Sequence, residues 1–540
     1  MAPERGGRRT GPRELRGTPA SPGLAAGPLV RLRPPAESRR AAGEPVAERA
    51  ALQRALEAAS GELGAMMEAA GADEDAAGIL AFQLAFLEDA TLTDPVYGAI
   101  AAGTPAEQAW REALDAQVAD FAGAEDAYFR GRAADIVDLR ERVLDRLAGR
   151  VEEPIPSGAI VVADDLPPSR FLAAEWQGGG LVLLRGSATS HVALLARSRG
   201  VPVLVGVGAA DLEGHGDALL DAEGGLLVLN PDAAARRRFE ARRAAAAARR
   251  AEEAEFLDRP AVTAAGERVQ VMVNIAGPDE LAALDPAPYD GIGLVRTEFL
   301  FHGRGGLPSE EEQYRAYRRI LEWAGLRPVT IRTLDAGGDK PVPGLTREGE
   351  SNPFLGVRGV RLTLRRPDVF RVQLRALARA ARHGRLKVMV PMVTMPHELA
   401  ESRALLQEAV DGLAAEGVAA ALPPLGMMVE VPAAALMLAD FPADFFSIGS
   451  NDLIQYLTAA SRDEPELAPL AQPTPALWRL LAEVAAEGRG SGREVGLCGD
   501  LAGDAGLVPQ LLDCGLRSLS MPAPAVAGVK AAIARYGRPA

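Results

Sequence analysis

One of the five histidines, His191, stands where the sequence signals the start of a helix. The strand-like run from Leu181 to Leu184 leads into a turn of small residues, and Thr189 or Ser190 then offers a capping hydroxyl. Apolar residues recur at helical spacing after it. The first turn of a helix favours a neutral imidazole and attracts anions, so His191 could accept a phosphoryl group. On spacing alone, a polar residue on an amphipathic helix remains the alternative.

Two acidic residues, Glu430 and Asp452, follow consecutive strand-like runs in the second half of the chain. On neighbouring strands, both carboxylates would point to one place. Carboxylates, waters and substrate oxygens together suit Mg²⁺, which prefers octahedral oxygen ligands. Taken singly, each residue is more typical of an acidic surface loop, and it is the pair that favours a metal site.

Several cationic side chains could clamp a phosphate and a carboxylate, because the guanidinium fork matches both groups. Arg296 and Arg332 end apolar strand-like runs, where an unpaired charge would be costly unless it faced a site. Lys340 is one of only three lysines. Arg358 and Arg462 complete the candidate set, although an isolated arginine is usually a solvated charge.

The two cysteines, Cys498 and Cys514, have different surroundings in the sequence. Cys498 ends a strand-like run in Gly496–Asp504, whereas we read Cys514 as a small core residue. From the residues alone, Cys498 also fits a core position.

Eight short strands separated by helical stretches must position these residues. Their number over about 270 residues matches a TIM barrel, whose active sites lie at the C-terminal ends of the strands. We expect the strands at Val269–Ile275, Gly291–Arg296, Val329–Thr333, Leu386–Val393, Leu425–Val431, Phe445–Ile448, Val495–Cys498 and Ser518–Met521.

The first half predicts an α/β domain, residues 17–32 and 148–230, interrupted by a helical block at 33–147. Apolar spacing suggests four helices in the block, with turns near Gly71, Thr93–Pro95 and Gly103–Pro105. Residues 1–16 read as a disordered tail or a mis-assigned start, and Thr18–Pro28 reads as a turn followed by a short strand through Val30. Residues 231–260 read as a solvated linker helix, and 261–540 as the barrel. The fold class is therefore multidomain α/β.

Composition limits the classes of function. The chain has 59 basic and 73 acidic residues, a net charge of −14, which argues against binding to nucleic acid or to an anionic membrane. No apolar run approaches a membrane span, and no secretory signal is recognisable. Two cysteines fit a reduced, cytoplasmic protein.

The segment Gly186–Arg197 resembles the phosphohistidine loop of the phosphoenolpyruvate-utilising enzymes. From about Gly17 to Val529, the chain looks like Enzyme I of the sugar phosphotransferase system. The other motifs that carry the resemblance are Gly291–Leu300, Ile331–Asp335, Asn352–Arg358, Met428–Pro432, Phe446–Leu453 and Gly496–Asp504.

The resemblance implies a role for each candidate. His191 accepts the phosphoryl group of phosphoenolpyruvate and passes it to a histidine of the phosphocarrier protein HPr, and pyruvate leaves. Cys498 protonates the enolate, and the helical block docks HPr. Substrate is held by Arg296, Arg332, Asn451, Asp452, Arg462, Lys340 and Arg358, with Mg²⁺ on Glu430 and Asp452. A homodimer through the barrel and a swivel of the histidine domain are also implied.

Three features depart from the family pattern. Ala188 and Asp500 replace a polar residue and a glutamate that are usual there, and the chain stops near Gly537, which bears on the dimer contact. Two readings stay open beside the main one: a paralogue serving a nitrogen-regulatory or dihydroxyacetone-kinase relay, and a non-catalytic sensor of phosphoenolpyruvate. A dikinase or synthase would need an ATP-grasp domain, for which we find no Gly-rich loop.

Overall fold

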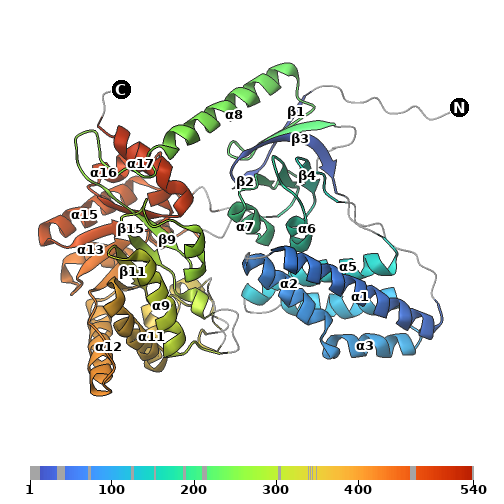
Figure 1. Ribbon diagram of the computed structural model, residues 1–540, viewed down its shortest axis with the longest axis horizontal. Helices are drawn as coiled ribbons and strands as arrows, with labels where there is room; N and C mark the ends of the chain where they lie inside the picture. Colours follow the sequence, from blue (N-terminus) through green and yellow to red (C-terminus); the bar gives the residue numbers. More distant parts are fainter. Residues whose placement is uncertain are drawn as a thin grey trace. The chain divides into compact units, whose positions relative to one another are not determined.

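The computed structural model divides the chain into two compact units, residues 1–245 and 246–540 (Figure 1). We describe each unit by itself. The structure describes residues 12–537 apart from 33–42, 71–73, 123–126, 151–153, 187–189, 209–215, 302–305, 339, 341, 343, 348–349, 462–466 and 468–469.

The first unit contains an eight-stranded sheet in the order β1-β8-β7-β3-β4-β5-β6-β2. Its centre, β3 to β6, is parallel, and the other pairs are antiparallel. The strands are β1 Arg13–Arg16, β2 Thr18–Ser21, β3 Leu24–Arg31, β4 Ile160–Ala163, β5 Gly180–Leu183, β6 Val203–Val205, β7 Asp217–Asp221 and β8 Leu226–Leu229. The central strands β4 and β5 are buried along their whole length, which explains their continuous apolar runs.

Two expectations about this sheet were wrong. Residues 13–16 are not part of a structureless tail, because β1 pairs antiparallel with β8 at one edge of the sheet. Alternate residues of the charged sequence Arg-Glu-Leu-Arg face outward there, which suits an edge strand. Thr18–Ser21, read as a turn, is strand β2.

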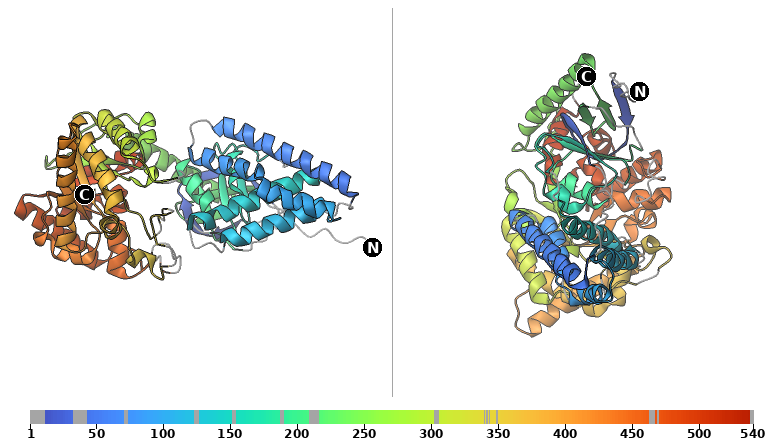
Figure 2. Two further views of the ribbon diagram at one scale, coloured as in Figure 1. Left: turned by 90° about the horizontal axis from the view of Figure 1, so that it is seen from below. Right: turned by 90° about the vertical axis from the view of Figure 1, so that its right-hand side faces the viewer.

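Helices fill the chain between β3 and β4. They are α1 Pro45–Ala70, α2 Glu74–Leu87, α3 Ala90–Ala101, α4 Ala106–Ala122 and α5 Ala127–Leu147. The left view of Figure 2 shows them, in blue to cyan, running alongside one another. They pack around one apolar cluster that includes the fully buried Trp110.

The described part of this block has five helices rather than the expected four. The break before α3 lies at Asp89, whose carboxylate accepts a hydrogen bond from Thr91 N at 2.8 Å and caps α3. The additional break, which makes the fifth helix, falls between the end of α4 and the start of α5. The predicted turn at Thr93–Pro95 is wrong, because Pro95 lies inside α3. The turn at Gly103–Pro105 is confirmed.

Two shorter helices, α6 Pro168–Leu172 and α7 His191–Ser198, complete the sheet domain. Helix α8, Ala233–Ala254, follows β8 and lies within residues 231–260, where a helix was predicted. Only Ala235 and Phe239 of α8 are buried, so most of its surface faces solvent.

The second unit is a closed barrel of eight parallel strands, β9 to β16. All eight predicted strands are confirmed, at β9 Gln270–Ile275, β10 Ile292–Val295, β11 Pro328–Arg332, β12 Arg385–Val390, β13 Leu425–Val429, β14 Phe445–Ile448, β15 Glu494–Leu497 and β16 Ser518–Met521. The helices around them are α9 Glu310–Ala324, α10 Val360–Arg365, α11 Pro367–Ala380, α12 Pro396–Ala415, α13 Pro432–Leu436, α14 Ser450–Thr458, α15 Pro475–Ser491, α16 Val508–Asp513 and α17 Val526–Arg535.

The barrel brings the C-terminal ends of all eight strands to one mouth, because every neighbouring pair is parallel. A layer of inward-facing side chains, Leu294, Met389, Met428, Phe445 and Cys498, forms a cluster of its own. The polar residues that follow the strands therefore gather around one opening.

Candidate active site

His191 is the first residue of helix α7, as the sequence predicts. Ser190 is the N-cap residue, and its hydroxyl accepts a hydrogen bond from Ala193 N at 3.3 Å. At the other end of the helix, Arg197 donates to the carbonyl of Ala20 at 2.7 Å and so ties α7 to β2. The backbone of His191 thus stands at the amide-rich end of a fixed helix. Ala188, also singled out in the sequence, lies outside the described residues.

Arg332 is the last residue of β11 and is almost fully buried. Its guanidinium lies 3.1 Å from Glu298 and 3.0 Å from Asp335. Burial by itself would lower the pKa of Arg332, but the neighbouring carboxylates raise it above its ordinary value. Among the described residues, its buried Nε has no hydrogen-bond partner. The Nε–H group of Arg332 is therefore a candidate hydrogen-bond donor to a bound anion.

Asp335 is the common partner of the cations at the mouth. It is fully buried, and its carboxylate lies 3.0 Å from Lys340 Nζ and 3.1 Å from Arg358 Nη2, in addition to Arg332. Burial would raise the pKa of Asp335, but these three cations hold it well below its usual range. The group is therefore an anion that fixes all three cations in place.

Arg358 has no exposed surface. It lies between two carboxylates, 3.1 Å from Asp335 and 3.4 Å from Asp452, and donates to Tyr456 Oη at 3.3 Å. Gly337 makes room for it: a Cβ on Gly337 would lie 2.6 Å from Arg358 Cβ, and the positive φ of 107° also favours glycine. Arg358 therefore joins the mouth as a buried ion-pair residue.

Glu430 directly follows β13 and is 1% exposed, and Asp452 lies in the first turn of α14. Burial, together with the charges of Asp452 and Asp335, raises the pKa of Glu430 to about 7. Glu430 accepts a hydrogen bond from Met392 N at 2.6 Å. The two predicted metal ligands thus lie close enough for their charges to oppose each other.

These two carboxylates suit a cation. In the described residues, no cluster of three or more acidic, histidine or cysteine side chains could hold a metal. Mg²⁺, however, commonly takes only one or two carboxylates and fills its other positions with water and phosphate oxygens. Gly449 keeps the place beside Glu430 open, because a Cβ there would lie 3.0 Å from its Oε2. The donor set therefore fits Mg²⁺ bound jointly with a substrate.

Cys498 directly follows β15 and belongs to the apolar layer inside the barrel. Its Sγ lies 3.5 Å from the carbonyl of Ile448. Burial raises the pKa of the Cys498 thiol to about 11. The thiol is therefore protonated near neutral pH and can act as an acid rather than as a nucleophile.

Three further candidate residues remain: Arg296, Asn451 and Arg462. Arg296 follows β10 and is exposed, within electrostatic reach of Cys498. Asn451 stands next to Asp452 in α14, and its Oδ1 accepts a hydrogen bond from Asp500 N at 2.9 Å. Arg462 lies outside the described residues. The mouth of the barrel thus brings together eight of the predicted residues: Arg296, Arg332, Lys340, Arg358, Glu430, Asn451, Asp452 and Cys498.

Two residues that organise the mouth were not among the predicted site residues. Glu298 pairs with Arg332 and accepts a hydrogen bond from Asp335 N at 3.0 Å, and Asp335 binds the cations. Their signal was visible in the sequence, since each is an acid two or three residues after an arginine at the end of an apolar run, Arg296 or Arg332. Their function as ion-pair partners of the cations could not be predicted, because it depends on which strands are neighbours.

Known proteins resemble the chain along nearly its whole length. Three family models match: "PEP-utilising enzyme, N-terminal" over residues 16–132, "PEP-utilising enzyme, mobile domain" over 155–225, and "PEP-utilising enzyme, PEP-binding domain" over 250–538. The phosphoenolpyruvate-protein phosphotransferase of Geobacillus stearothermophilus is 39% identical, over 97% of this chain and 93% of the relative. The protein of that name from Bacillus subtilis is 37% identical, over 97% and 95%. None of the described helices is long and apolar enough to cross a membrane.

Proposed function

The chain belongs to the PEP-utilising enzyme family, and we propose that it is a phosphoenolpyruvate-protein phosphotransferase. It moves the phosphoryl group of phosphoenolpyruvate to His191 and then to a histidine of the phosphocarrier protein HPr, and it releases pyruvate. This is the first step of the sugar phosphotransferase system. The relatives support the proposal through their name and because the match covers 97% of this chain.

One observation at the barrel mouth carries the proposal. Arg332 and Lys340 are both held by the buried Asp335, and Arg332 keeps one buried donor without a partner among the described residues. A substrate with a phosphate and a carboxylate supplies the acceptors that such cations lack. We assign substrate contacts to Arg332, Arg296, Lys340 and Asn451, and to Arg462 from the resemblance. For Arg358, whose surface is fully buried, we propose that it positions Asp335 and Asp452.

We propose that Mg²⁺ is held by Glu430 and Asp452 when substrate binds. The ion would supply positive charge beside the phosphate and carboxylate oxygens. Burial and the charges of Asp452 and Asp335 raise the pKa of Glu430, and a divalent cation beside the two carboxylates would offset both effects, which supports this assignment.

The transfer itself follows from the chemistry of two side chains. A neutral imidazole nitrogen of His191 forms the new bond to phosphorus while the bond between phosphorus and the enol oxygen breaks. The electron pair passes into the enolate, whose terminal carbon takes the proton of the Cys498 thiol, and the resulting thiolate regains a proton from solvent. A thiol pKa of about 11 keeps that proton in place until the enolate forms.

Other parts of the chain complete the cycle. We propose that the helical block α1–α5 docks HPr, and that the sheet domain swivels so that His191 can meet first the barrel and then the carrier. A swivel of this kind also shields a labile phosphohistidine from water. We further propose a homodimer formed through the barrel.

Incubation with labelled phosphoenolpyruvate and Mg²⁺ tests the proposal. We expect acid-labile label on the wild type and on His397→Ala, in which an exposed histidine of α12 is removed, but not on His191→Ala. Phosphoenolpyruvate that binds without any labelling would instead support the sensor. Transfer of label to a nitrogen-regulatory carrier in preference to HPr would support the paralogous relay.

A further inference from the structure

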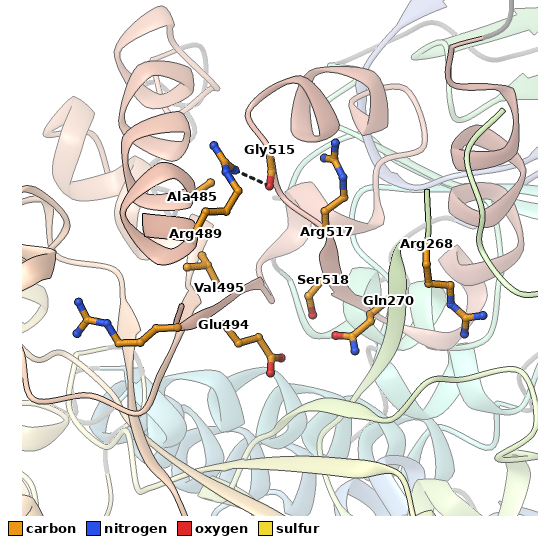
Figure 3. Close-up of a pocket in the computed structure, with 10 residues that line it drawn as sticks. Arg268, Gln270, Ala485, Arg489, Glu494, Val495, Gly515, Arg517 and Ser518 are labelled. Atoms are coloured by element: carbon orange, nitrogen blue, oxygen red, sulfur yellow. Dashed lines mark hydrogen bonds between the residues drawn. The ribbon is translucent and has the colours of Figure 1, made fainter. Parts of the chain in front are cut away.

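A polar cavity lies at the opposite end of the barrel from the mouth. It has a volume of about 400 Å³ and is lined by Arg268, Gln270, Ala485, Arg489, Arg493, Glu494, Val495, Gly515, Arg517 and Ser518 (Figure 3). Gln270, Glu494 and Ser518 are the first residues of β9, β15 and β16, so the cavity opens at the N-terminal ends of these strands. Its volume falls in the range of small-molecule sites.

The charge of the lining is strongly positive, with four arginines and one glutamate. Three of the arginines have carboxylate partners: Arg268 with Asp290, Arg493 with Glu487, and Arg517 with Glu267. Lys387 pairs with Glu494 at 2.5 Å and so offsets the one acid. These pairs are partly exposed, and such pairs are weak and easily exchanged for a stronger anionic partner.

Arg489 differs from the other three arginines. In the described part of the chain, its guanidinium donates a hydrogen bond to the carbonyl of Gly515, at 3.0 Å. Figure 3 shows Arg489 and Arg517 on either side of Gly515. A Cβ on Gly515 would lie 2.0 Å from Arg489 Nη1, and its φ of 89° is one that L residues rarely adopt. The backbone is thus shaped around this guanidinium.

Neutral polar groups stand beside the arginines. Gln270 and Ser518 are register partners on β9 and β16, and both face the cavity (Figure 3). An amide and a hydroxyl can bond either to phosphate oxygens or to the hydroxyl groups of an ester. Arg489, Gly515 and Arg517 also line an adjoining hollow of about 370 Å³, which gives a ligand room to extend.

We propose that this cavity is a binding site for a small metabolite that carries a phosphate group. The guanidiniums of Arg489 and Arg517 would hold the phosphate, and Gln270 and Ser518 the rest of the molecule. Guanidinium groups bind phosphate through paired, charge-assisted hydrogen bonds. These are stronger than the present hydrogen bonds of Arg489 to the Gly515 carbonyl and of Arg517 to the carbonyls of Leu512 and Leu516. The inference does not depend on the reaction proposed for the barrel mouth.

Calorimetric titration of the full chain tests this site, without phosphoenolpyruvate or Mg²⁺. The probes are inorganic phosphate, glycerol 3-phosphate and, as an anion without phosphate, succinate. The decisive variant is Arg489→Gln. The matched control is Arg385→Gln, which removes an exposed arginine at the start of β12, at the same end of the barrel but outside the cavity lining.

We expect Arg489→Gln to weaken the binding of both phosphate probes by about tenfold or more, the effect of losing a charged hydrogen bond. Arg385→Gln should bind them like the wild type. Arg517→Gln is a second variant and should weaken them in the same way. Melting curves, together with label uptake from phosphoenolpyruvate, show whether each variant is folded.

Equal phosphate binding by the wild type, Arg489→Gln and Arg385→Gln would overturn the proposal, as would a wild type that binds neither phosphate probe. Succinate that binds as tightly as the phosphate probes, and loses as much affinity in Arg489→Gln, would overturn the assignment to phosphate. Failure of label uptake in the wild type would count against the proposed transferase and leave this titration unaffected.

Discussion

Two buried carboxylates at the barrel mouth are expected to affect stability in opposite directions. Burial, together with the negative charges of Asp452 and Asp335, raises the pKa of Glu430 to about 7, whereas three cations hold the pKa of Asp335 well below its usual range. Replacing each by its amide keeps the size and removes the charge. We predict that Glu430→Gln stabilises the metal-free protein and that Asp335→Asn destabilises it.

The magnitude for Glu430 follows from its pKa. A rise from 4.5 to about 7 in the folded state corresponds to about 3 kcal/mol lost when the carboxyl ionises. Because the folded state holds the proton more tightly, this loss is absent below pH 4.5, grows as the pH rises to 7, and is complete above 7. A glutamine at this position does not ionise and so avoids this loss of stability. Its side-chain oxygen can still accept the hydrogen bond from Met392 N.

We expect Asp335→Asn to change the stability in the opposite direction, by lowering it. Its removal leaves Arg332, Lys340 and Arg358 facing one another, and two of these are buried. Breaking a buried ion pair by removing one partner costs about 3–5 kcal/mol. The wild type should therefore lie between the two variants in stability at pH 8.

Denaturant unfolding in EDTA at pH 8 and at pH 5 measures both effects. We expect the gain in Glu430→Gln at pH 8 to shrink strongly at pH 5. Addition of Mg²⁺ with phosphoenolpyruvate should stabilise the wild type but not Glu430→Gln. A Glu430→Gln protein less stable than the wild type at pH 8 would refute the reasoning, because its carboxylate would then contribute favourably without metal.

Three further predictions concern the transfer. Cys498→Ala should slow pyruvate formation by about 10²–10⁴-fold, the usual effect of losing a general acid. In a Cys514→Ser background, the remaining Cys498 thiol should resist iodoacetamide at pH 8, and rapid alkylation would contradict its raised pKa. Arg332→Lys should lower kcat/KM, measured by pyruvate release, by about 10–100-fold, because an ammonium group cannot form the paired hydrogen bonds of a guanidinium group. An unchanged kcat/KM would show that Arg332 does not contact the substrate. Ser190→Ala should cost about 1 kcal/mol of local stability in α7, because the helix loses its N-cap, and we expect faster amide exchange there. It should also slow phosphorylation of His191. Unaltered amide exchange in α7 would show that the cap is dispensable.

The barrel was predictable from sequence because its signals are local. Each strand is a short apolar run, and a parallel barrel places the residue after each run at the mouth whatever the details of packing. The start of α7 was equally accessible, since Ser190 carries the cap within its own sequence neighbourhood.

Other features depend on tertiary contacts and were missed. Pro95 lies inside α3 although proline usually marks a break, because the true break is set by the carboxylate cap of Asp89 six residues earlier. Strand β1 is recognisable only through its partner β8, more than 200 residues away. The function of Asp335 in binding three cations likewise follows from which strands and loops meet.

A single-turnover experiment tests the central claim most directly. The wild-type chain is mixed with phosphoenolpyruvate and Mg²⁺ in the absence of any carrier, and pyruvate is counted while intact-mass and peptide analysis locate the phosphoryl group. We predict one pyruvate for each chain that gains one phosphoryl group, with that group on His191. Pyruvate released without phosphorylation of His191, or a phosphoryl group found on another residue, would contradict the account.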